Sequence, residues 1–131
     1  MPYIHIQVSG EENNALAAQV AAKASELTSS ILNKDPALTA VVVDFVAQSN
    51  WFVAGQSLAE HDLRSYHWLV SITDETNTKS QKAAYMKAVH EAMQQLLSGV
   101  AEHSYIHIAD LRAAAYGFGG LTQEHRYQQT N

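Results

Sequence analysis

The 131-residue sequence contains no cysteine, which excludes disulfides, thiol nucleophiles and thiolate metal sites. Basic residues are scarce: eight Lys plus Arg, without a basic block, stand against 13 Asp plus Glu and leave a net charge of −5. This balance gives nucleic-acid binding little support. No apolar run approaches the roughly 18 residues of a membrane span, and no signal pattern opens the chain. We expect a cytoplasmic protein with neither nucleic acid nor membrane as partner.

The remaining composition is that of one globular domain. Hydrophobic residues make up 47% of the chain and charged residues 16%, which is a light charge for a protein that exposes its whole surface. A chain of this length can bury one core but is too short for two ordinary domains. We expect part of the surface to be covered by other subunits.

Pro2 gives the N-terminus an unusual functional group. A small residue after the initiator methionine favours removal of Met1, so the mature chain is expected to begin with the free secondary amine of Pro2. An α-amino group titrates near neutral pH, and burial in an apolar pocket lowers its pKa further. Such an amine can act as a base and return the proton as the conjugate acid.

The first half of the chain predicts a strand, a helix and a second strand. Residues 3–8 alternate polar and apolar side chains, which predicts a strand with one apolar face. Ser9 and Glu12 fit a capping box for a helix over residues 11–32, which Pro36 terminates.

The second strand is expected over residues 38–46. Its β-branched run Val41-Val42-Val43 is typical of a strand covered on both faces. The crossover through the helix predicts that this strand runs parallel to the first. An aromatic segment that ends in glycine follows at residues 50–55.

The same order recurs in the second half, after a polar connection over residues 56–65. Thr78 with Gln81 forms a second capping box, and Gly99 stands at the expected helix C-cap. Strands are expected at residues 66–73 and 103–111, with a second aromatic-glycine segment at 116–120.

An offset of 65 residues superimposes the two aromatic-glycine segments, since 116 minus 51 is 65. This predicts two pseudo-repeat halves, about 2–55 and 66–120, within a single domain over residues 1–131, followed by a loosely held polar tail at 123–131. The expected fold class is α/β (α+β): a four-stranded mixed sheet with both helices on one face. The other face would be apolar and buried against copies of the chain.

Together, the N-terminal proline, the duplicated β-α-β units and the two aromatic-glycine segments resemble the tautomerase superfamily. Residues 105–118 align without gaps with the macrophage migration inhibitory factor family, and Lys34-Asp35-Pro36 falls where that family has its pocket lysine. The resemblance implies a homotrimer with pockets between subunits and a cofactor-free keto-enol tautomerase that acts on a small 2-keto acid.

The resemblance also implies roles for individual residues. Pro2 would be the base, and Lys34 would lower its pKa and hold a substrate oxyanion or carboxylate. Ser71 and Ile72 match the strand segment that lines the pocket with backbone groups. Tyr105 matches a tyrosine from the neighbouring subunit, and His107 replaces an asparagine of that family. The expected aromatic walls of the pocket are Trp51, Tyr116 and Phe118.

Several charged positions depart from other branches of the superfamily. The 4-oxalocrotonate tautomerase-like members have arginines where this chain has Glu11 or Glu12 and Val42. The cis-3-chloroacrylic acid dehalogenase-like members have arginines where this chain has residues 74–77. These differences favour a monocarboxylate substrate over a dicarboxylate, with Arg112 and Arg64 as candidates for a second carboxylate ligand.

Three alternatives remain open. One is a protein-binding or regulatory member of the same fold with a vestigial pocket, which a retained Met1 would favour because it acylates the amine. Another is a decarboxylase or hydratase that uses Pro2. The third is a metal site at His5, His103 and His107, which the sequence disfavours because no carboxylate joins them at ligand spacing. We expect no metal.

Overall fold

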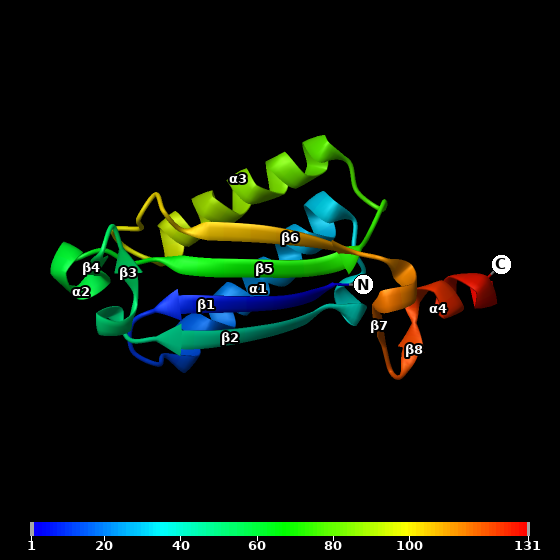
Figure 1. Cartoon of the computed structure of the whole chain (residues 1–131), viewed down its shortest axis with the longest axis horizontal. Helices are drawn as coiled ribbons and strands as arrows, with labels where there is room; N and C mark the ends of the chain where they lie inside the picture. The colour runs from blue at the N-terminus through cyan, green and yellow to red at the C-terminus, as the bar shows by residue number, and fades with distance from the viewer. Residues whose placement is uncertain (1, 131) are drawn as a thin grey trace.

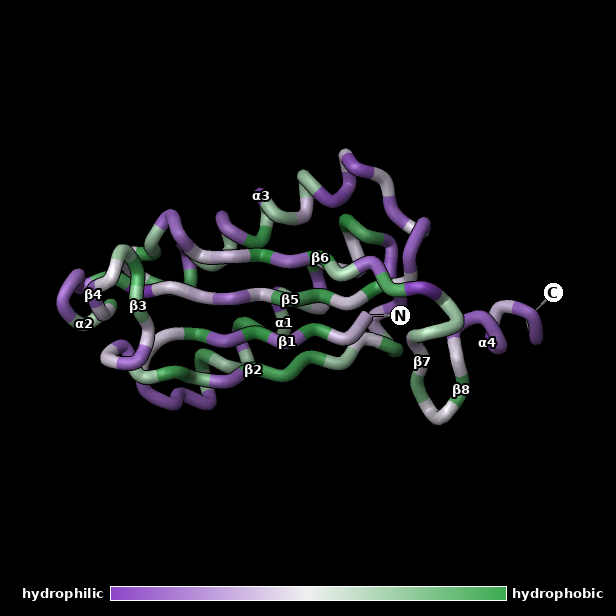
Figure 2. The backbone as a smooth tube through the Cα atoms, viewed as in Figure 1, coloured by the Kyte–Doolittle hydropathy of each residue, from purple (hydrophilic) through white to green (hydrophobic). Residues whose placement is uncertain are grey.

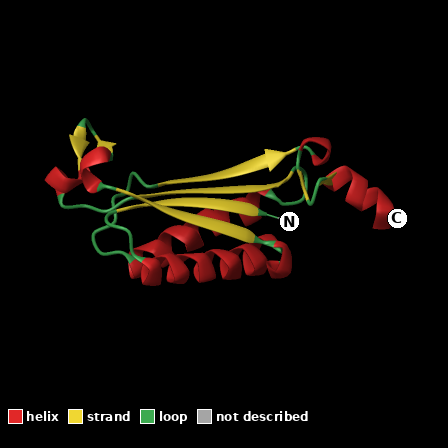
Figure 3. Cartoon of the chain, turned by 90° about the horizontal axis from the view of Figure 1, so that it is seen from below, coloured by secondary structure: helices red, strands yellow, loops and turns green. Residues whose placement is uncertain are grey.

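The computed structural model describes residues 2–130, so the expected removal of Met1 concerns a residue outside the described part. A four-stranded sheet has the order β2-β1-β5-β6, and two long helices, α1 and α3, lie on one face of it (Figure 1, Figure 3). The bounds are β1 Tyr3–Ser9, α1 Asn14–Leu32, β2 Ala40–Val46, β5 Tyr66–Thr73, α3 Lys79–Leu96 and β6 Tyr105–Leu111.

Strand pairing confirms the predicted fold class. β1 runs parallel to β2 and β5 runs parallel to β6, while β1 and β5 pair antiparallel in the middle of the sheet. Each parallel pair is joined through one of the long helices, as a β-α-β crossover requires.

The core lies between the sheet and the two helices. Alternate residues of β1 and β5 point toward the helices and are fully buried, because successive side chains of a strand face opposite sides. The largest fully buried side chains include Trp68, Tyr66 and Tyr85. The Tyr85 hydroxyl contacts Thr28 Oγ1 at 2.9 Å and accepts a hydrogen bond from Trp68 Nε1 at 3.0 Å, so it joins both helices to the sheet.

Only one of the two predicted capping boxes is present. Thr78 and Gln81 exchange both bonds at the start of α3, at 2.9 and 3.1 Å. The box at Ser9 is wrong: α1 begins later, with Asn13 as N-cap accepting from the Leu16 N–H at 3.0 Å. Ser9 belongs to β1, and its Oγ accepts the Ser65 N–H at 2.8 Å instead.

Two groups of short elements lie at opposite ends of the sheet (Figure 1). The end where the described chain begins is called the proline end, and the opposite end is called the far end. The far end holds η2 Gln48–Asn50, β3 Phe52–Val53, β4 Gln56–Ser57 and α2 Leu58–His61. The proline end holds η1 Pro36–Leu38, η3 Ala113–Ala115, β7 Gly117–Phe118, β8 Leu121–Thr122 and α4 Gln123–Thr130.

The loosely held C-terminal tail is a wrong prediction, because residues 123–130 form α4. The helix is mostly hydrophilic (Figure 2), so its sequence carries no apolar stripe. Arg126 holds it: its guanidinium lies 3.7 Å from the centre of the Phe118 ring and donates to the Phe118 carbonyl at 2.9 Å.

β2 is an edge strand, and its Val42 side chain is 40% exposed in the single chain, so coverage of both faces of β2 stays a prediction about the assembled protein. The prediction of an apolar open face is wrong, since this face of the sheet carries His5, His67 and His107 among others. Among the described residues, no helix combines the length and apolar character needed to cross a membrane.

Candidate functional site

Pro2 is buried and lies in the wall of a cavity of about 590 Å³ at the proline end. Its carbonyl accepts the Ala40 N–H at 3.3 Å, which fixes the residue between β1 and the start of β2. The cavity is lined by Pro2, Tyr3, Ala37, Leu38, Thr39, Ala40, Tyr116, Gly117 and Phe118. This cavity, called the proline pocket, has a largely apolar lining with two phenol groups.

Tyr116 connects the pocket wall to the sheet. Its hydroxyl donates to the Ser71 carbonyl at 3.0 Å. Burial raises the pKa of Tyr116, and a weaker opposing effect on that pKa comes from a hydrogen bond with the Tyr3 backbone. The phenol therefore stays protonated at neutral pH.

Ser71 and Ile72 lie near the end of β5 and are not among the residues that line the proline pocket. Ser71 pairs with Tyr3 across β1 and β5, and its side chain lies on the open face. The Ile72 side chain is fully buried in the core, so only its backbone could contact a substrate.

Lys34 is not among the residues that line the proline pocket. Its Nζ donates to Thr76 Oγ1 at 2.8 Å, in the loop after β5. Burial lowers the pKa of Lys34, while the negative charge of Asp110 raises it less strongly. Asp110 itself pairs with Lys82 of α3 at 2.5 Å, which directs this charged group toward the helix side of the sheet.

Tyr105 and His107 lie on the open face, away from the proline pocket of their own chain. Their rings are stacked with centres 6.4 Å apart, and His107 Nδ1 contacts His67 Nε2 at 2.8 Å. In the register of β5 and β6, Ser71 pairs with Ala109, so Tyr105 lies four residues before that pair, at the start of β6. Tyr105 is 61% exposed and free to meet another molecule.

The remaining candidates divide between the two ends of the sheet. Phe118 and Tyr116 line the proline pocket, and Arg112 precedes η3 at the same end. Trp51 instead lines a far-end cavity of about 250 Å³ that also includes Phe52, Val53, His103 and Tyr105. Arg64 is also at the far end, where its backbone pairs with residues 99 and 101.

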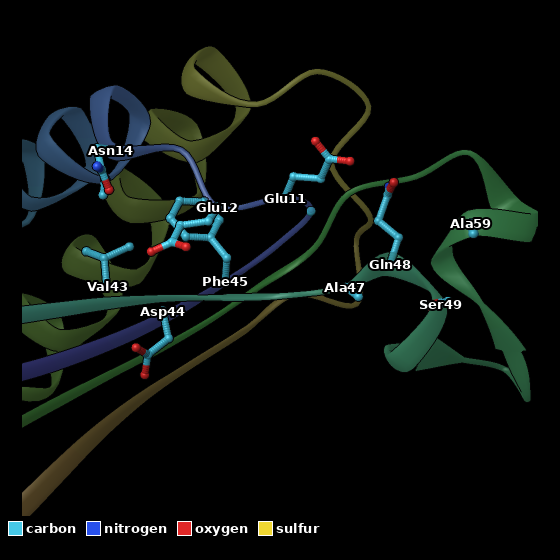
Figure 4. Close-up of a pocket in the computed structure, with 12 residues that line it drawn as sticks. Glu11, Glu12, Asn14, Val43, Asp44, Phe45, Ala47, Gln48, Ser49 and Ala59 are labelled. Atoms are coloured by element: carbon cyan, nitrogen blue, oxygen red, sulfur yellow. The ribbon is translucent and has the colours of Figure 1, made fainter.

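A cavity of about 680 Å³ between the start of α1 and the end of β2 has carboxylates in its wall. Figure 4 shows Asp44 on the opposite side of β2 from Glu12, and Asp44 contacts His5 Nε2 at 2.7 Å on the open face. Among the described residues, no group of three His, Cys, Asp or Glu side chains could hold a metal ion.

The pocket also contains residues that the sequence analysis missed. Leu38 and its neighbours in η1 follow Pro36 directly, and the exposed side chain of Leu38 lines the cavity. The sequence analysis assigned Leu38 to the second strand, whereas that strand begins at Ala40 and Leu38 belongs to η1. Arg126 does not line the pocket but packs on Phe118, eight residues earlier; it was missed because the sequence analysis expected no helix in the polar tail.

Comparison with known proteins shows the family. The "Probable tautomerase K2" of Dickeya dadantii (strain 3937) is 33% identical over 61 residues, which are 46% of this chain and 91% of that relative. The chain belongs to the tautomerase superfamily. No protein-family model matches it. The relative is much the shorter chain, since nearly all of it matches less than half of this superfamily member.

Solved structures agree on the fold of this tautomerase superfamily chain. The structure of Pt0534 inactivated by 2-oxo-3-pentynoate has a TM-score of 0.82 and 15% identity, covering 95% of this chain and 98% of the other. The F6 fused 4-OT wild-type asymmetric trimer has a TM-score of 0.80 and 14% identity, with the same coverage. At these identities, the likeness concerns the fold alone.

Proposed function

We propose that the protein is a cofactor-free tautomerase in which Pro2, freed by removal of Met1, interconverts the enol and keto forms of a small 2-keto acid. The observation that carries the proposal is the burial of Pro2 in the wall of a largely apolar pocket. Burial disfavours an ammonium ion and so lowers the pKa of an amine toward neutral pH. The kinship with a probable tautomerase supports the same chemistry.

In the proposed reaction, the Pro2 nitrogen takes a proton from the enol oxygen or from carbon and returns it at another carbon. One amine can do both because it alternates between base and conjugate acid. The aromatic walls Tyr116 and Phe118 exclude water, which strengthens electrostatic interactions with the substrate oxygen. Lys34 would have to turn away from Thr76 to hold a substrate carboxylate.

We further propose a homotrimer in which Tyr105 and His107 of one subunit complete the proline pocket of the next. Their exposure on the open face, away from their own Pro2, supports this arrangement, as does the trimeric state of a fused 4-OT with the same fold. Light scattering coupled to size-exclusion chromatography tests it, with a monomeric mass as the contrary result.

The decisive experiment compares the wild type with Pro2→Ala in ketonisation of phenylpyruvate enol or 2-hydroxymuconate. We expect a loss of about 10²- to 10⁴-fold in kcat/KM, the usual contribution of a general base. Pro36→Ala, at the other proline of the chain, is the matched control and should keep most of the activity. Equal activity of wild type and Pro2→Ala would remove Pro2 from the mechanism.

Intact mass separates this function from the non-enzymatic alternative. A retained Met1 would acylate the Pro2 nitrogen and favour a protein-binding or regulatory role. Release of carbon dioxide or uptake of water in place of ketonisation would indicate the decarboxylase or hydratase alternative.

A further inference from the structure

The hydroxyl of Tyr116 lies at the junction of the two central strands, next to Pro2. The Tyr116 ring lines the proline pocket together with Pro2 and Tyr3. Its O–H donates to the carbonyl of Ser71, the residue of β5 that pairs with Tyr3 of β1. The hydroxyl also forms a hydrogen bond with the Tyr3 backbone. One phenol thus touches both strands at the pair that directly follows Pro2.

This arrangement leaves Tyr116 poorly suited to donate a proton to substrate. Its single hydrogen is committed to the Ser71 carbonyl, and a phenol has only one to give. Its position suits a different role. Pro2 is joined to Tyr3 by a peptide bond, so a contact that holds Tyr3 against β5 also restricts the ring nitrogen of Pro2.

The backbone around Tyr116 is itself fixed. The Gln123 N–H donates to the Tyr116 carbonyl at 2.8 Å, and the Ala115 N–H donates to the Arg112 carbonyl at 2.8 Å in the preceding turn. The tyrosine therefore reaches the strands from a rigid support. At the far end, the residue 65 positions earlier is Trp51, which has no hydroxyl.

We propose that Tyr116 is a positioning residue for Pro2: by joining Tyr3 to Ser71, its hydroxyl sets the place of the Pro2 nitrogen in the pocket. This inference rests on the proposed function. A displacement of about 1 Å at a reacting group can cost about 100-fold in rate, so one contact that prevents such a displacement has a measurable effect.

The test uses Tyr116→Phe, which keeps the ring and removes the hydroxyl. With phenylpyruvate enol, we expect kcat to fall about tenfold, the effect of one hydrogen bond, while KM changes little. Tyr127→Phe, on the exposed surface of α4, is the matched control and should leave both constants unchanged. A rise in KM alone would overturn the inference, because it would make the hydroxyl a substrate contact.

A second readout does not depend on turnover. The probe is 2-oxo-3-pentynoate, an activated alkyne: the amine nitrogen bonds to its C4 and a proton is added at C3, so the protein gains the whole mass of the reagent. We expect Tyr116→Phe to slow this modification of the Pro2 amine at pH values on both sides of neutrality. An equal rate in wild type and variant would overturn the inference.

Backbone amide exchange of Tyr3 provides the third readout, which separates positioning from a failure to fold. Faster exchange of Tyr3 in Tyr116→Phe, with unchanged exchange in the helix residues Val20 and Val89, supports the inference; unchanged exchange of Tyr3 contradicts it. If Pro2→Ala keeps full activity, the proposed function fails, yet the modification and exchange rates still decide the role of Tyr116.

Discussion

The two ends of the sheet have closely similar backbones and different side chains. At the far end, the Leu58 N–H donates to the Trp51 carbonyl at 2.8 Å; at the proline end, the Gln123 N–H donates to the Tyr116 carbonyl at 2.8 Å. Both pairs are related by the offset of 65, since 123 minus 58 and 116 minus 51 are both 65. The turns match as well, with Gly55 at φ 78° and Gly120 at φ 82°.

The same offset relates the residues that line the two cavities. Leu38 and Ala40 of the proline pocket correspond to His103 and Tyr105 of the far-end cavity. By strand register, however, the place of Pro2 is taken at the far end by Tyr66, whose hydroxyl contacts His90 Nδ1 at 2.6 Å. Because Tyr66 lies within the chain, its nitrogen is part of a peptide bond and cannot act as an amine base. The fold therefore builds two related cavities, the proline pocket and the far-end cavity. The proposed chemistry depends on the N-terminus lying at the first of them.

The largest expected effect is on stability and compares Gly117 with its counterpart Phe52. A Cβ added to Gly117 would lie 2.0 Å from the Leu121 carbonyl oxygen, whereas its counterpart Phe52 carries a side chain that is 62% exposed. We expect Gly117→Ala to lower the free energy of unfolding by about 3 kcal/mol, near the upper part of the range for overpacking, and Phe52→Gly to lower it far less. Urea denaturation measures both. Equal losses would show that the β7–β8 turn yields to the added methyl group.

The next effect concerns the pocket walls. Phe118→Ala removes a ring that lines the proline pocket and supports Arg126, and we expect kcat/KM for the enol substrate to fall about tenfold, as for the loss of about 1.4 kcal/mol of apolar contact. Val53→Ala is the matched change 65 positions earlier and should leave kcat/KM unaltered. A larger loss in Val53→Ala than in Phe118→Ala would indicate that the far-end cavity, and not the proline pocket, binds the substrate.

The smallest effect is a pH dependence of stability at His67, the counterpart of Tyr3 by strand register. Burial lowers the pKa of His67 below its usual 6.5, and the nearby His107 and His5 lower it further. The unfolded chain therefore binds a proton more readily, so the free energy of unfolding falls as the pH drops below 6.5. We expect the urea midpoint to fall less between about pH 7.5 and about pH 5 in His67→Gln than in wild type. Tyr3→Phe, the control, should keep the wild-type decrease.

Much of the architecture could be predicted because short stretches of sequence determine it. The alternation of residues 3–8 and 66–73 identifies the buried faces, and the capping box at Thr78 identifies the start of α3. The edge position of β2 could not be predicted, since strand order depends on pairing partners rather than on the run Val41-Val42-Val43.

The candidate site was predictable to a smaller extent. Pro2, Tyr116 and Phe118 line one cavity, while their roles in a reaction stay predictions. Trp51 lines the far-end cavity instead, because it is the counterpart of Tyr116 in the other half of the chain. The pairing of His67 with His107 depends on the register of β5 and β6, and α4 depends on Arg126 finding Phe118. The histidines are 40 positions apart; Arg126 and Phe118 are only eight apart, but they meet because the β7–β8 turn brings the chain back.

Both ends of the described chain lie at the proline end of the sheet (Figure 1), with consequences for protein production. An affinity tag fused ahead of Pro2 would block its amine, and one fused after α4 would load the helix whose Arg126 supports Phe118. The β3–β4 turn at Ala54 and Gly55 is exposed and lies at the opposite end of the sheet. A tag inserted in that turn would leave the proline end of its own chain free, but it would lie in the same cavity wall as Tyr105.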